Sequence, residues 1–468
     1  KQKTAYEIHR SLEFRRVLCR SRGSRGGRRG PGGPPIHVRL LQPFSRPGNV
    51  DPDLHECGVQ RVAGWVHHLG PREQHRQRVR RMIRRTVTPR PDWEARLREV
   101  GFTWFAPTPE HPVPYWSEDG YYAFTPAQIE HLRAASQDLT NLVLEATGHA
   151  IEHGRLAELG IPPFLHSAVR DSWEGDDPTV YMRLDLAYDG RGAVKLLEVN
   201  AQTPTSLLEA AVSQWQWLED QRSRGELPAG ATQWNTIHEG LTEQWAHLKA
   251  ARGLTEVAFS SARVDEDAAT VTYLRELAGA AGLRTSFIFT EELGTSPTEP
   301  YLLDSWSLPI RQLMWLWPFE FAWESRDSAF LASTGTRFIE PLWKAATGSK
   351  GLLALLHELN PGHPNLLPAT LTPGALGADV VRKPLYSREG QNVQLPGQES
   401  TPGAYADLPV VEQAYTELPT AHAPDGPRYP VLGVWIAGSE VCGLGIREGR
   451  SRVTDNRATF APHVVLPG

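Results

Sequence analysis

Hydrophobic and polar positions alternate between Tyr181 and Tyr188, which is the pattern of a half-buried β-strand. Side chains in a strand repeat every two residues, so one face is entirely apolar and consists of Met182, Leu184 and Leu186. The other face carries Arg183 and Asp185. Residues 189–192 read Asp-Gly-Arg-Gly, a sequence that favours a turn. The pattern therefore predicts the first arm of a β-hairpin.

The returning arm, residues 193–200, places Glu198 and Asn200 on one face by the same period. If the arms pair about the turn, Arg183 lies roughly opposite Glu198, although a slip in register would change the partner. Carboxylate and amide oxygens are the hard ligands that Mg²⁺ prefers beside nucleotide phosphates, and a neighbouring Arg suits a carboxylate or an oxyanion. A solvated polar face with a simple Arg183–Glu198 pair is the alternative, and these residues alone leave both interpretations open.

A short polar segment, residues 201–206, joins this hairpin to a predicted helix over residues 207–218. Ser206 and Glu209 have the spacing of a capping box at its start. A helix N-terminus aimed at the hairpin would add free backbone N–H groups and a dipole that favours an anion.

A second capping pattern, Thr125 followed by Pro126 and Gln128, predicts a long helix with apolar residues at helical spacing up to Ala146. Near its end, residues 149–153 match H-x-x-E-H, in which two His side chains one turn apart share Zn²⁺ and the Glu acts as a base. In a chain with 17 His, we favour a chance match on a surface helix.

Residues 254–340 show the pattern of a small α/β unit. Strands are predicted at 257–259 and 285–289, with a helix from Ala268 to Ala280 between them. Without a glycine fingerprint, this unit is not evidence for a dinucleotide site. Asp265, Glu266 and Asp267 precede the helix, where acidic residues are favourable for a purely structural reason.

Composition bounds the class of protein. With 468 residues, 40% of them hydrophobic, we expect about two to four domains or subdomains. Apolar runs are too short to span a membrane, so we expect a soluble chain. Of the three Cys residues only Cys442 follows residue 81, which excludes a disulfide framework there and favours a reducing, cytoplasmic location.

The first 81 residues differ from the rest. They hold 18 Lys and Arg against 6 Asp and Glu, whereas the remainder has a net charge of −17. Arg22 to Pro35 is rich in Arg, Gly and Pro without periodicity, and the first Met is Met82. We expect residues 1–81 to be a translation or assembly artefact; a basic nucleic-acid arm or targeting segment is the alternative. The acidic remainder argues against nucleic-acid binding by the folded part.

Arg183-x-Asp185, a turn, and then L-L-E-x-N-A-x-T-P-T-S-L over residues 196–207 resemble the signature of the glutathionylspermidine synthase family, in the ATP-grasp superfamily of carboxylate-amine ligases. The resemblance extends from Met82 to the C-terminus, and includes Glu340-Pro341-Leu342-Trp343-Lys344 and Lys383-Pro384-Leu385-Tyr386-Ser387-Arg388-Glu389-Gly390. It implies a mixed α/β chain with an ATP-grasp fold and an inserted small α/β unit. The implied divisions are an N-terminal region with the hairpin, the small unit and the ATP-binding part, at residues 82–253, 254–340 and 341–468.

The resemblance also implies roles for individual residues. Arg183 is expected to stabilise the tetrahedral oxyanion during catalysis. The implied Mg²⁺ ligands are Asp185, Glu198 and Asn200. The implied ATP contacts are Lys350, Lys383, Arg388, Gly390, Gln413 and Arg447. The implied substrate contacts are Thr203, Thr205, Glu266 and Asp267, with the acidic pair helping to bind the amine.

The implied activity is an ATP- and Mg²⁺-dependent ligation of a small-molecule or peptide carboxylate, such as glutathione, to a polyamine-like amine through an acyl phosphate. Neither a membrane nor a nucleic acid is an expected partner. Gln202 stands where the family commonly has Asp, and residues 317–320 only partly match the Tyr-Pro-Trp-Glu expected there. No amidase region is recognised, so a synthetase-type activity is expected. The alternatives are a nucleotide-binding protein without ligase activity and a zinc metallopeptidase using His149 and His153.

Overall fold

The computed structural model describes residues 82–109, 112–325 and 328–467. Residues 1–81, for which we predicted an artefact, lie outside this range together with Cys19 and Cys57. Helices and several separate sheets combine in the described residues, which confirms the mixed α/β class. No helix in these ranges combines the length and the apolar character needed to cross a membrane.

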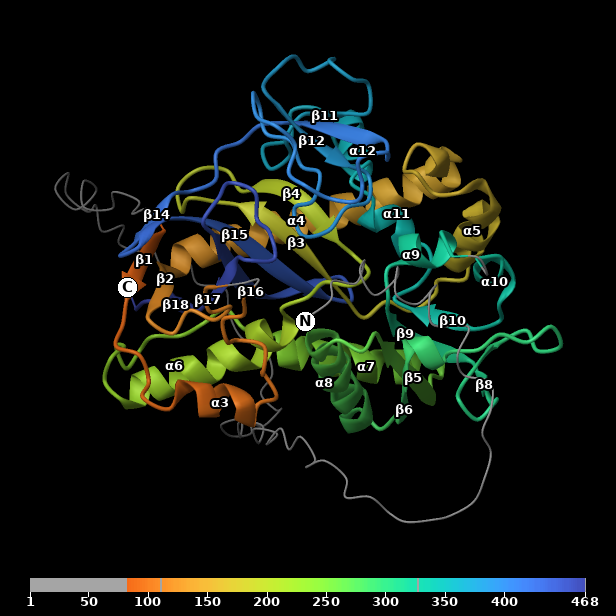
Figure 1. Cartoon of the computed structure of the whole chain (residues 1–468), viewed down its shortest axis with the longest axis horizontal. Coiled ribbons are helices and arrows are strands. Elements are labelled where there is room, and N and C mark those ends of the chain that lie inside the picture. Colours follow the sequence, from red (N-terminus) through yellow and green to blue (C-terminus); the bar gives the residue numbers. More distant parts are fainter. Residues whose placement is uncertain (1–81, 110–111, 326–327, 468) are drawn as a thin grey trace, which may run out of the picture.

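The predicted hairpin lies at one edge of an antiparallel sheet that occupies the middle of the molecule (Figure 1). The strand order is β17-β16-β15-β3-β4, and β14 pairs with the start of β15. The strands of this central sheet are β3 (Tyr181–Ala187), β4 (Lys195–Asn200), β14 (Ala421–Ala423), β15 (Gly426–Ala437), β16 (Glu440–Gly449) and β17 (Thr459–Ala461).

The register of the hairpin differs from the symmetrical pairing that we expected. Arg183 pairs with Asn200 and Asp185 pairs with Glu198, so the expected Arg183–Glu198 pair is wrong. The reason is that the connection spans residues 188–194 and the ladder is irregular after Asp185, neither of which the turn sequence reveals. The side chains of both pairs still share one face, because directly opposed residues point the same way.

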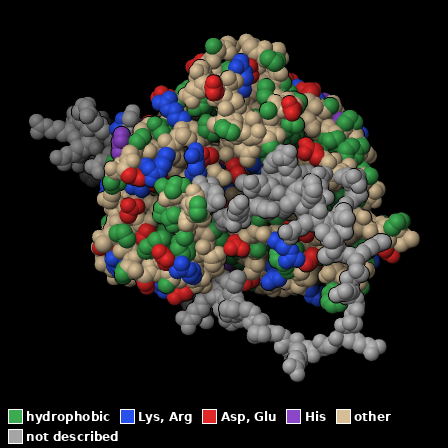
Figure 2. All heavy atoms as spheres, in the orientation of Figure 1, with side chains coloured by type: hydrophobic (Ala, Val, Ile, Leu, Met, Phe, Trp, Pro, Cys, Tyr) green, Lys and Arg blue, Asp and Glu red, His purple; other side chains and the backbone are tan. Residues whose placement is uncertain are grey.

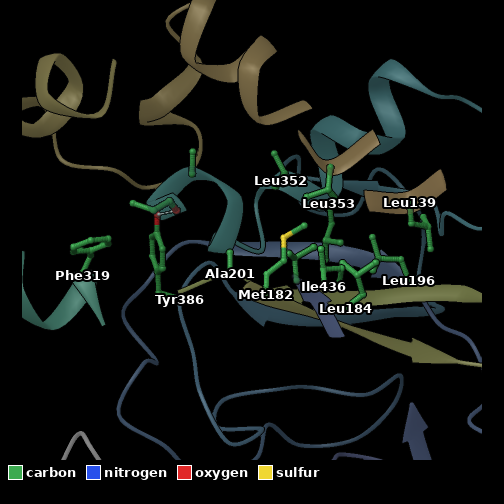
Figure 3. Packing of buried hydrophobic residues seen from close by; sticks show 14 of the residues in the cluster. Leu139, Met182, Leu184, Leu196, Ala201, Phe319, Leu352, Leu353, Tyr386 and Ile436 are labelled. Atoms are coloured by element: carbon green, nitrogen blue, oxygen red, sulfur yellow. Dashed lines mark hydrogen bonds between the residues drawn. The ribbon is translucent and has the colours of Figure 1, made fainter. Parts of the chain in front are cut away.

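The apolar face of β3 packs against helices that cross the central sheet. Met182 and Leu184 lie beside Ile436 of the neighbouring strand β15, on the face of the sheet that Leu139, Leu352 and Leu353 cover (Figure 3). Leu139 belongs to α4 (Pro126–Glu152), whose Thr125–Gln128 capping box is present as predicted. The two leucines open α12 (Leu352–Leu359). Burial of this face fixes the opposite face, with Arg183 and Asp185, toward the functional cleft described below.

The expected small α/β unit contains a parallel sheet with the order β10-β9-β5-β6. Helix α8 begins at Asp265 rather than Ala268, so the acidic residues form its first turn. Trp315 and Trp317 are buried in the hydrophobic core. The elements are β5 (Glu256–Ser261), α8 (Asp265–Ala280), β6 (Arg284–Phe289), β9 (Gln312–Leu316) and β10 (Arg337–Ile339). The division of the chain into domains stays a prediction.

Smaller sheets complete the fold. Strands β11 (Ala369–Thr370), β13 (Val410–Ala414) and β12 (Val380–Pro384) form an antiparallel sheet above the central one in Figure 1. The other small sheets are β1 (Ile83–Thr86) with β2 (Gly120–Phe124) and β18 (His463–Val465), and β7 (Leu302–Leu303) with β8 (Pro309–Ile310). The further α-helices are α3 (Trp93–Glu99), α5 (His166–Glu174), α6 (Gln214–Ser223), α7 (Ile237–Arg252), α9 (Phe319–Trp323), α10 (Phe330–Ser333) and α11 (Lys344–Gly348). Figure 2 shows acidic and basic side chains interspersed over the described part of one face.

The capping box expected at Ser206 and Glu209 does not form. Ser206 has a φ of +69°, and its hydroxyl lies 2.7 Å from the hydroxyl of Tyr115. Glu209 accepts a hydrogen bond from Trp104 and opens a π-helix, Glu209–Ser213, that runs into α6. Partners from a distant loop therefore replace the local capping contacts that the spacing predicted.

A buried ion pair joins the parallel sheet to the central sheet. Glu340, directly after β10, accepts hydrogen bonds from the backbone N–H groups of Val180 and Tyr181 at 3.0 and 2.9 Å. The ammonium of Lys344 lies 2.6 Å from Glu340 and also donates to the Tyr181 carbonyl at 2.6 Å. Burial lowers the pKa of Lys344, and the charge of Glu340 opposes that effect. The pair fixes the position of the first residues of β3.

We predict that Glu340→Gln lowers the free energy of unfolding by about 3 to 5 kcal/mol, because it leaves a buried ammonium without its carboxylate. Urea denaturation measures this. Glu94→Gln is the matched control, since Glu94 pairs with Arg98 on the surface of α3 and should change stability by less than about 1 kcal/mol. Equal stability of the two variants would contradict the role given to Glu340.

Candidate functional site

A single cleft of about 340 Å³ brings together the side chains that the sequence singled out. It opens at the carboxyl ends of β5 and β9, where Val264 and Leu316 lie, and extends along the polar face of the hairpin. All fourteen expected site residues line it: Arg183, Asp185, Glu198, Asn200, Thr203, Thr205, Glu266, Asp267, Lys350, Lys383, Arg388, Gly390, Gln413 and Arg447. The roles of these residues stay predictions, but their placement requires contacts between segments far apart in the chain.

The middle of the cleft is the polar face of the hairpin. Arg183 donates to both oxygens of Asp185, at 2.6 and 3.1 Å, and to the carbonyl of Thr205 at 2.6 Å. Arg447 of β16 approaches the same Asp185 carboxylate at 3.3 Å. The Arg183 side chain is only 5% exposed, and its guanidinium lies 5.6 Å above the ring of Trp435. This guanidinium is therefore held in one orientation by three elements.

The predicted Mg²⁺ ligands lie on this same face. Asp185 and Glu198 are cross-strand partners, and Asn200 opposes Arg183. The amide nitrogen of Asn200 is buried without a hydrogen-bond partner, so the amide group is available to a ligand whichever way it is oriented. In the described ranges no group of three or more His, Cys, Asp or Glu could enclose an ion alone. Two carboxylates and an amide nevertheless fit Mg²⁺ that arrives with nucleotide phosphates and keeps some of its waters.

Two lysines form a cationic end of the cleft beside Glu198. Lys350 lies 3.4 Å from Glu198 and donates to the Ser387 carbonyl at 2.8 Å. Lys383 donates to Gln413 at 2.8 Å and to the Leu197 carbonyl at 2.9 Å. Enclosure would raise the pKa of Glu198, but the neighbouring cations, led by Lys350 and Lys383, lower it to about 2. Burial lowers the pKa of Lys383 to about 8. This end of the cleft therefore favours an anion.

Arg388 and Gly390 lie on a tight turn that closes one side of the cleft. The N–H of Gln391 donates to the Arg388 carbonyl at 3.0 Å, and both central residues of the turn have positive φ, +56° at Glu389 and +68° at Gly390. Any side chain at position 390 would have its Cβ 2.7 Å from the carbonyl oxygen of Thr454, so glycine is required there. Arg388 donates to the hydroxyl of Thr203 at 2.8 Å, which ties this turn to the segment after β4.

The part of the cleft around Glu266 and Asp267 is acidic and is called the acidic end below. Burial raises the pKa of Asp267 to about 7, with a further contribution from the charge of Glu266. Burial also raises the pKa of Glu266, and the negative charge of Glu389 adds to this. Carboxylates that are enclosed and close to one another are stabilised by a bound cation. This end therefore favours a positively charged group.

Several functional candidates could not be found from local sequence patterns. Trp104 and Tyr115, from the loop after α3, line the acidic end, and Glu209 lies directly behind them. Arg452 and Arg457 contribute from the loop between β16 and β17. The aromatic content of residues 102–116 was visible in the sequence, but its proximity to Glu266 depends on tertiary contacts.

Gln202, which departs from the family pattern, also lines the cleft. Its carbonyl oxygen accepts from the backbone N–H of Phe319 at 3.1 Å, and its amide nitrogen donates to the Lys344 carbonyl at 3.4 Å. An Asp side chain could make the first contact but not the second, because a carboxylate has no hydrogen to donate. Gln202 thus connects the segment after β4 to the starts of α9 and α11.

The H-x-x-E-H motif lies apart from this cleft, at the end of α4. The rings of His149 and His153 stack with centroids 4.0 Å apart, and His153 contacts the backbone carbonyl of His149. Among the residues that the structure describes, no further His, Cys, Asp or Glu completes a group of three around them. The geometry does not support a zinc peptidase centre.

The buried Glu209 carboxyl group should make the stability of the protein depend on pH. Burial, with the charge of Glu266, raises its pKa to about 8 from an ordinary value near 4.5. Because the folded state then binds a proton that the unfolded state has released, this group destabilises the protein as pH rises from about 4.5 to 8. Glu209→Gln should therefore become more stable relative to the wild type between pH 5 and 8, by at most about 1.4 kcal/mol per pH unit. Urea denaturation at each pH measures the difference, and a constant difference would contradict a buried, protonated Glu209.

Comparison with known proteins identifies a family for the whole described chain. The sequence profile described as "Glutathionylspermidine synthase preATP-grasp" matches residues 84–466. A Haemophilus influenzae protein, whose name proposes acid–amine ligase activity, is 34% identical over 394 residues, covering 81% of this chain and 98% of that protein. The trypanothione synthetase of Crithidia fasciculata is 27% identical over 367 residues, covering 71% of this chain.

The chain covers different fractions of the lengths of its relatives. It spans 54% of the Crithidia fasciculata trypanothione synthetase, and 59% of the bifunctional glutathionylspermidine synthetase/amidase of Escherichia coli, to which it is 25% identical over 384 residues. A solved structure of a glutathione synthetase-like effector from Globodera pallida has a TM-score of 0.47 and 11% identity, over 74% of this chain and 89% of that one. The profile match and the 34% identity show that this chain belongs to the glutathionylspermidine synthase family, whose named relatives are ligases.

Proposed function

We propose that this protein joins a carboxylate to an amine at the expense of ATP, through an acyl phosphate. The observation that carries the proposal is the distribution of charge along one cleft. A cationic end with Lys350 and Lys383 and an acidic end with Glu266 and Asp267 flank the Arg183 guanidinium. Ligation of this kind needs an anionic phosphoryl donor on one side of a carboxylate and an amine on the other. The amine binds as an ammonium ion, loses a proton before it attacks, and displaces inorganic phosphate from the acyl phosphate.

The cationic end supplies the nucleotide site. Lys350 and Lys383 would neutralise the γ-phosphate as it moves to the substrate carboxylate. Arg388, held against Thr203, and Arg447, held against Asp185, add positive charge between the two ends, since Arg388 also acts on Asp267 and Arg447 on Glu266. Apolar side chains also line the cleft, among them Leu395, Val431 and Val381, the cross-strand partner of Gln413. They offer a slot of the character that an adenine ring requires.

The middle of the cleft would hold Mg²⁺ through Asp185, Glu198 and Asn200. When bound, Mg²⁺ would reduce the negative charge of the phosphates. Asp185 also orients Arg183, since it accepts hydrogen bonds from two guanidinium nitrogens. Arg183 would stabilise the oxyanion that forms when the amine attacks the acyl phosphate, which is the role of a preorganised donor.

The acidic end would bind the amine substrate. Thr205, whose carbonyl accepts from Arg183, adjoins Glu266 and connects this end to the reacting centre. A polyamine fits this end because its ammonium groups compensate carboxylates whose pKa values burial raises. The names of the relatives support glutathione and a polyamine as the first substrates to test. A cytoplasmic location stays a prediction.

We predict that ADP release in the presence of Mg-ATP, glutathione and a polyamine is lost in both Asp185→Ala and Glu198→Ala. Arg183→Ala should reduce turnover by about 10²-fold or more while Mg-ATP binding changes little, because its role lies in the transition state. Arg191→Ala is the matched control, since Arg191 is exposed in the hairpin connection outside the cleft. Amine-stimulated turnover retained in Arg183→Ala would overturn the role given to Arg183. Mg-dependent nucleotide binding without turnover by any tested pair would favour a nucleotide-binding protein without ligase activity.

Gly433 provides a second test of Arg183 that removes no charged group. A Cβ added at Gly433 would lie 2.8 Å from Cδ of Arg183, whose head group is fixed by its hydrogen bonds. We predict that Gly433→Ala shifts the guanidinium and lowers kcat by up to about 10²-fold, with little change in the Kd for Mg-ATP. Steady-state kinetics and calorimetry measure the two quantities. An unchanged kcat would show that the position of Arg183 is not critical.

A further inference from the structure

The acidic end of the cleft has an aromatic side that no local motif marks. Trp104 and Tyr115 both line the cleft, and burial together with the nearby charges of Glu209 and Glu266 raises the pKa of Tyr115, which places this ring beside the acidic end. Phe102, which is fully buried, packs against both rings, with centroid distances of 4.8 Å to Trp104 and 6.0 Å to Tyr115. The loop is anchored further by the backbone N–H of Phe460, which donates to the Tyr115 carbonyl at 2.6 Å. The two rings therefore form a wall that is fixed in place from behind.

Glu209 holds the Trp104 ring of this wall. Its Oε1 accepts a hydrogen bond from the indole N–H of Trp104 at 3.1 Å, and its side chain is fully buried. Its second oxygen, Oε2, is buried without a partner among the described residues. Placing a carboxyl group there costs stability, which is offset elsewhere in the fold. The residue also begins the π-helix Glu209–Ser213, and short π-helical segments are frequent at functional sites.

We propose that Trp104 and Tyr115 are specificity-determining residues for a cationic amine substrate, and that Glu209 is a positioning residue that fixes the Trp104 ring. The proposal rests on the proposed ligase function and refines its amine site. An aromatic face opposite carboxylates is a favourable environment for an ammonium group and for the carbon chain that carries it. The carboxylates supply charge, while the aromatic wall excludes water from one side of the chain.

The roles of Trp104 and Glu209 can be tested separately, with two variants at each position. Trp104→Phe keeps an aromatic face, whereas Trp104→Leu removes it. Glu209→Gln keeps an oxygen that accepts from the indole N–H, whereas Glu209→Leu cannot accept and would release the ring. Trp306→Leu is the matched control, because Trp306 is 82% accessible and lies outside the cleft.

The test is calorimetric titration of spermidine into the full chain in the presence of Mg-ATP, for the wild type and these five variants. Trp104→Leu and Glu209→Leu should raise the Kd for spermidine by roughly 3- to 30-fold, the range of a cation–π contact in a partly enclosed site. The expected Kd of Trp104→Phe, Glu209→Gln and Trp306→Leu is within about threefold of the wild-type value, and the Kd for Mg-ATP should not change in any variant. Failure of the wild type to bind spermidine, or wild-type affinity in Trp104→Leu, would overturn the proposal. Should Glu209→Leu fail to fold, loss of affinity in Glu209→Gln equal to that in Trp104→Leu would overturn the positioning role.

A second readout separates this proposal from the ligase function. Hydroxylamine is an uncharged nucleophile that converts an acyl phosphate to a hydroxamate, with release of inorganic phosphate. With Mg-ATP and glutathione, hydroxamate formation should have the same KM for hydroxylamine in Trp104→Leu as in the wild type. A raised KM for hydroxylamine would show a general distortion and contradict the proposal. Spermidine binding without any hydroxamate would count against the ligase function and leave the aromatic wall standing.

Discussion

The buried pair between Glu340 and Lys344 is the contact on which the arrangement of the cleft depends. It joins the end of the parallel sheet to the backbone of Val180 and Tyr181, two residues before Arg183. A buried ion pair gains little net stability over an apolar contact, because both charges lose their hydration. Here the ion pair fixes the position of the parallel sheet relative to the central sheet, because only one position of β3 satisfies both charges and both backbone N–H groups.

From that fixed start, strand periodicity accounts for the rest of the central site. Met182 and Leu184 are committed to the core by burial, which turns Arg183 and Asp185 into the cleft. Because the Arg183 side chain must lie on the cleft face, the neighbouring strand has Gly433 opposite Asp185, which leaves room for the aliphatic part of Arg183. The orientation of the guanidinium is thus a consequence of core packing and one absent side chain.

Much of the fold and of the cleft could be predicted from the sequence, because the informative residues lie in local patterns. The alternation of apolar and polar residues predicted the hairpin, and a capping box predicted the start of α4. The turn residues predicted the position of the connection after Tyr188. The residues carried over from the family resemblance also share the cleft, although their roles stay predictions. The errors have different physical causes. The register error in the hairpin comes from the length of its connection and the irregular ladder after Asp185, whereas the capping-box error comes from competition by tertiary contacts. Ser206 and Glu209 have capping-box spacing, yet Tyr115 and Trp104 supply partners that a local pattern cannot reveal.

In the proposed reaction, the separation of charge within the cleft would prevent each reactant from binding in the place of the other. Lysines at one end disfavour an ammonium group, and carboxylates at the other disfavour a phosphate, so electrostatic repulsion sorts the two. The Arg183 side chain lies between these ends with its charge shared by Asp185, so it attracts neither reactant strongly before the reaction. In the proposed mechanism, the Arg183 guanidinium would stabilise the negative charge that develops on the oxygen of the reacting carboxyl group, and the aromatic wall at Trp104 and Tyr115 would shield one side of the amine from water.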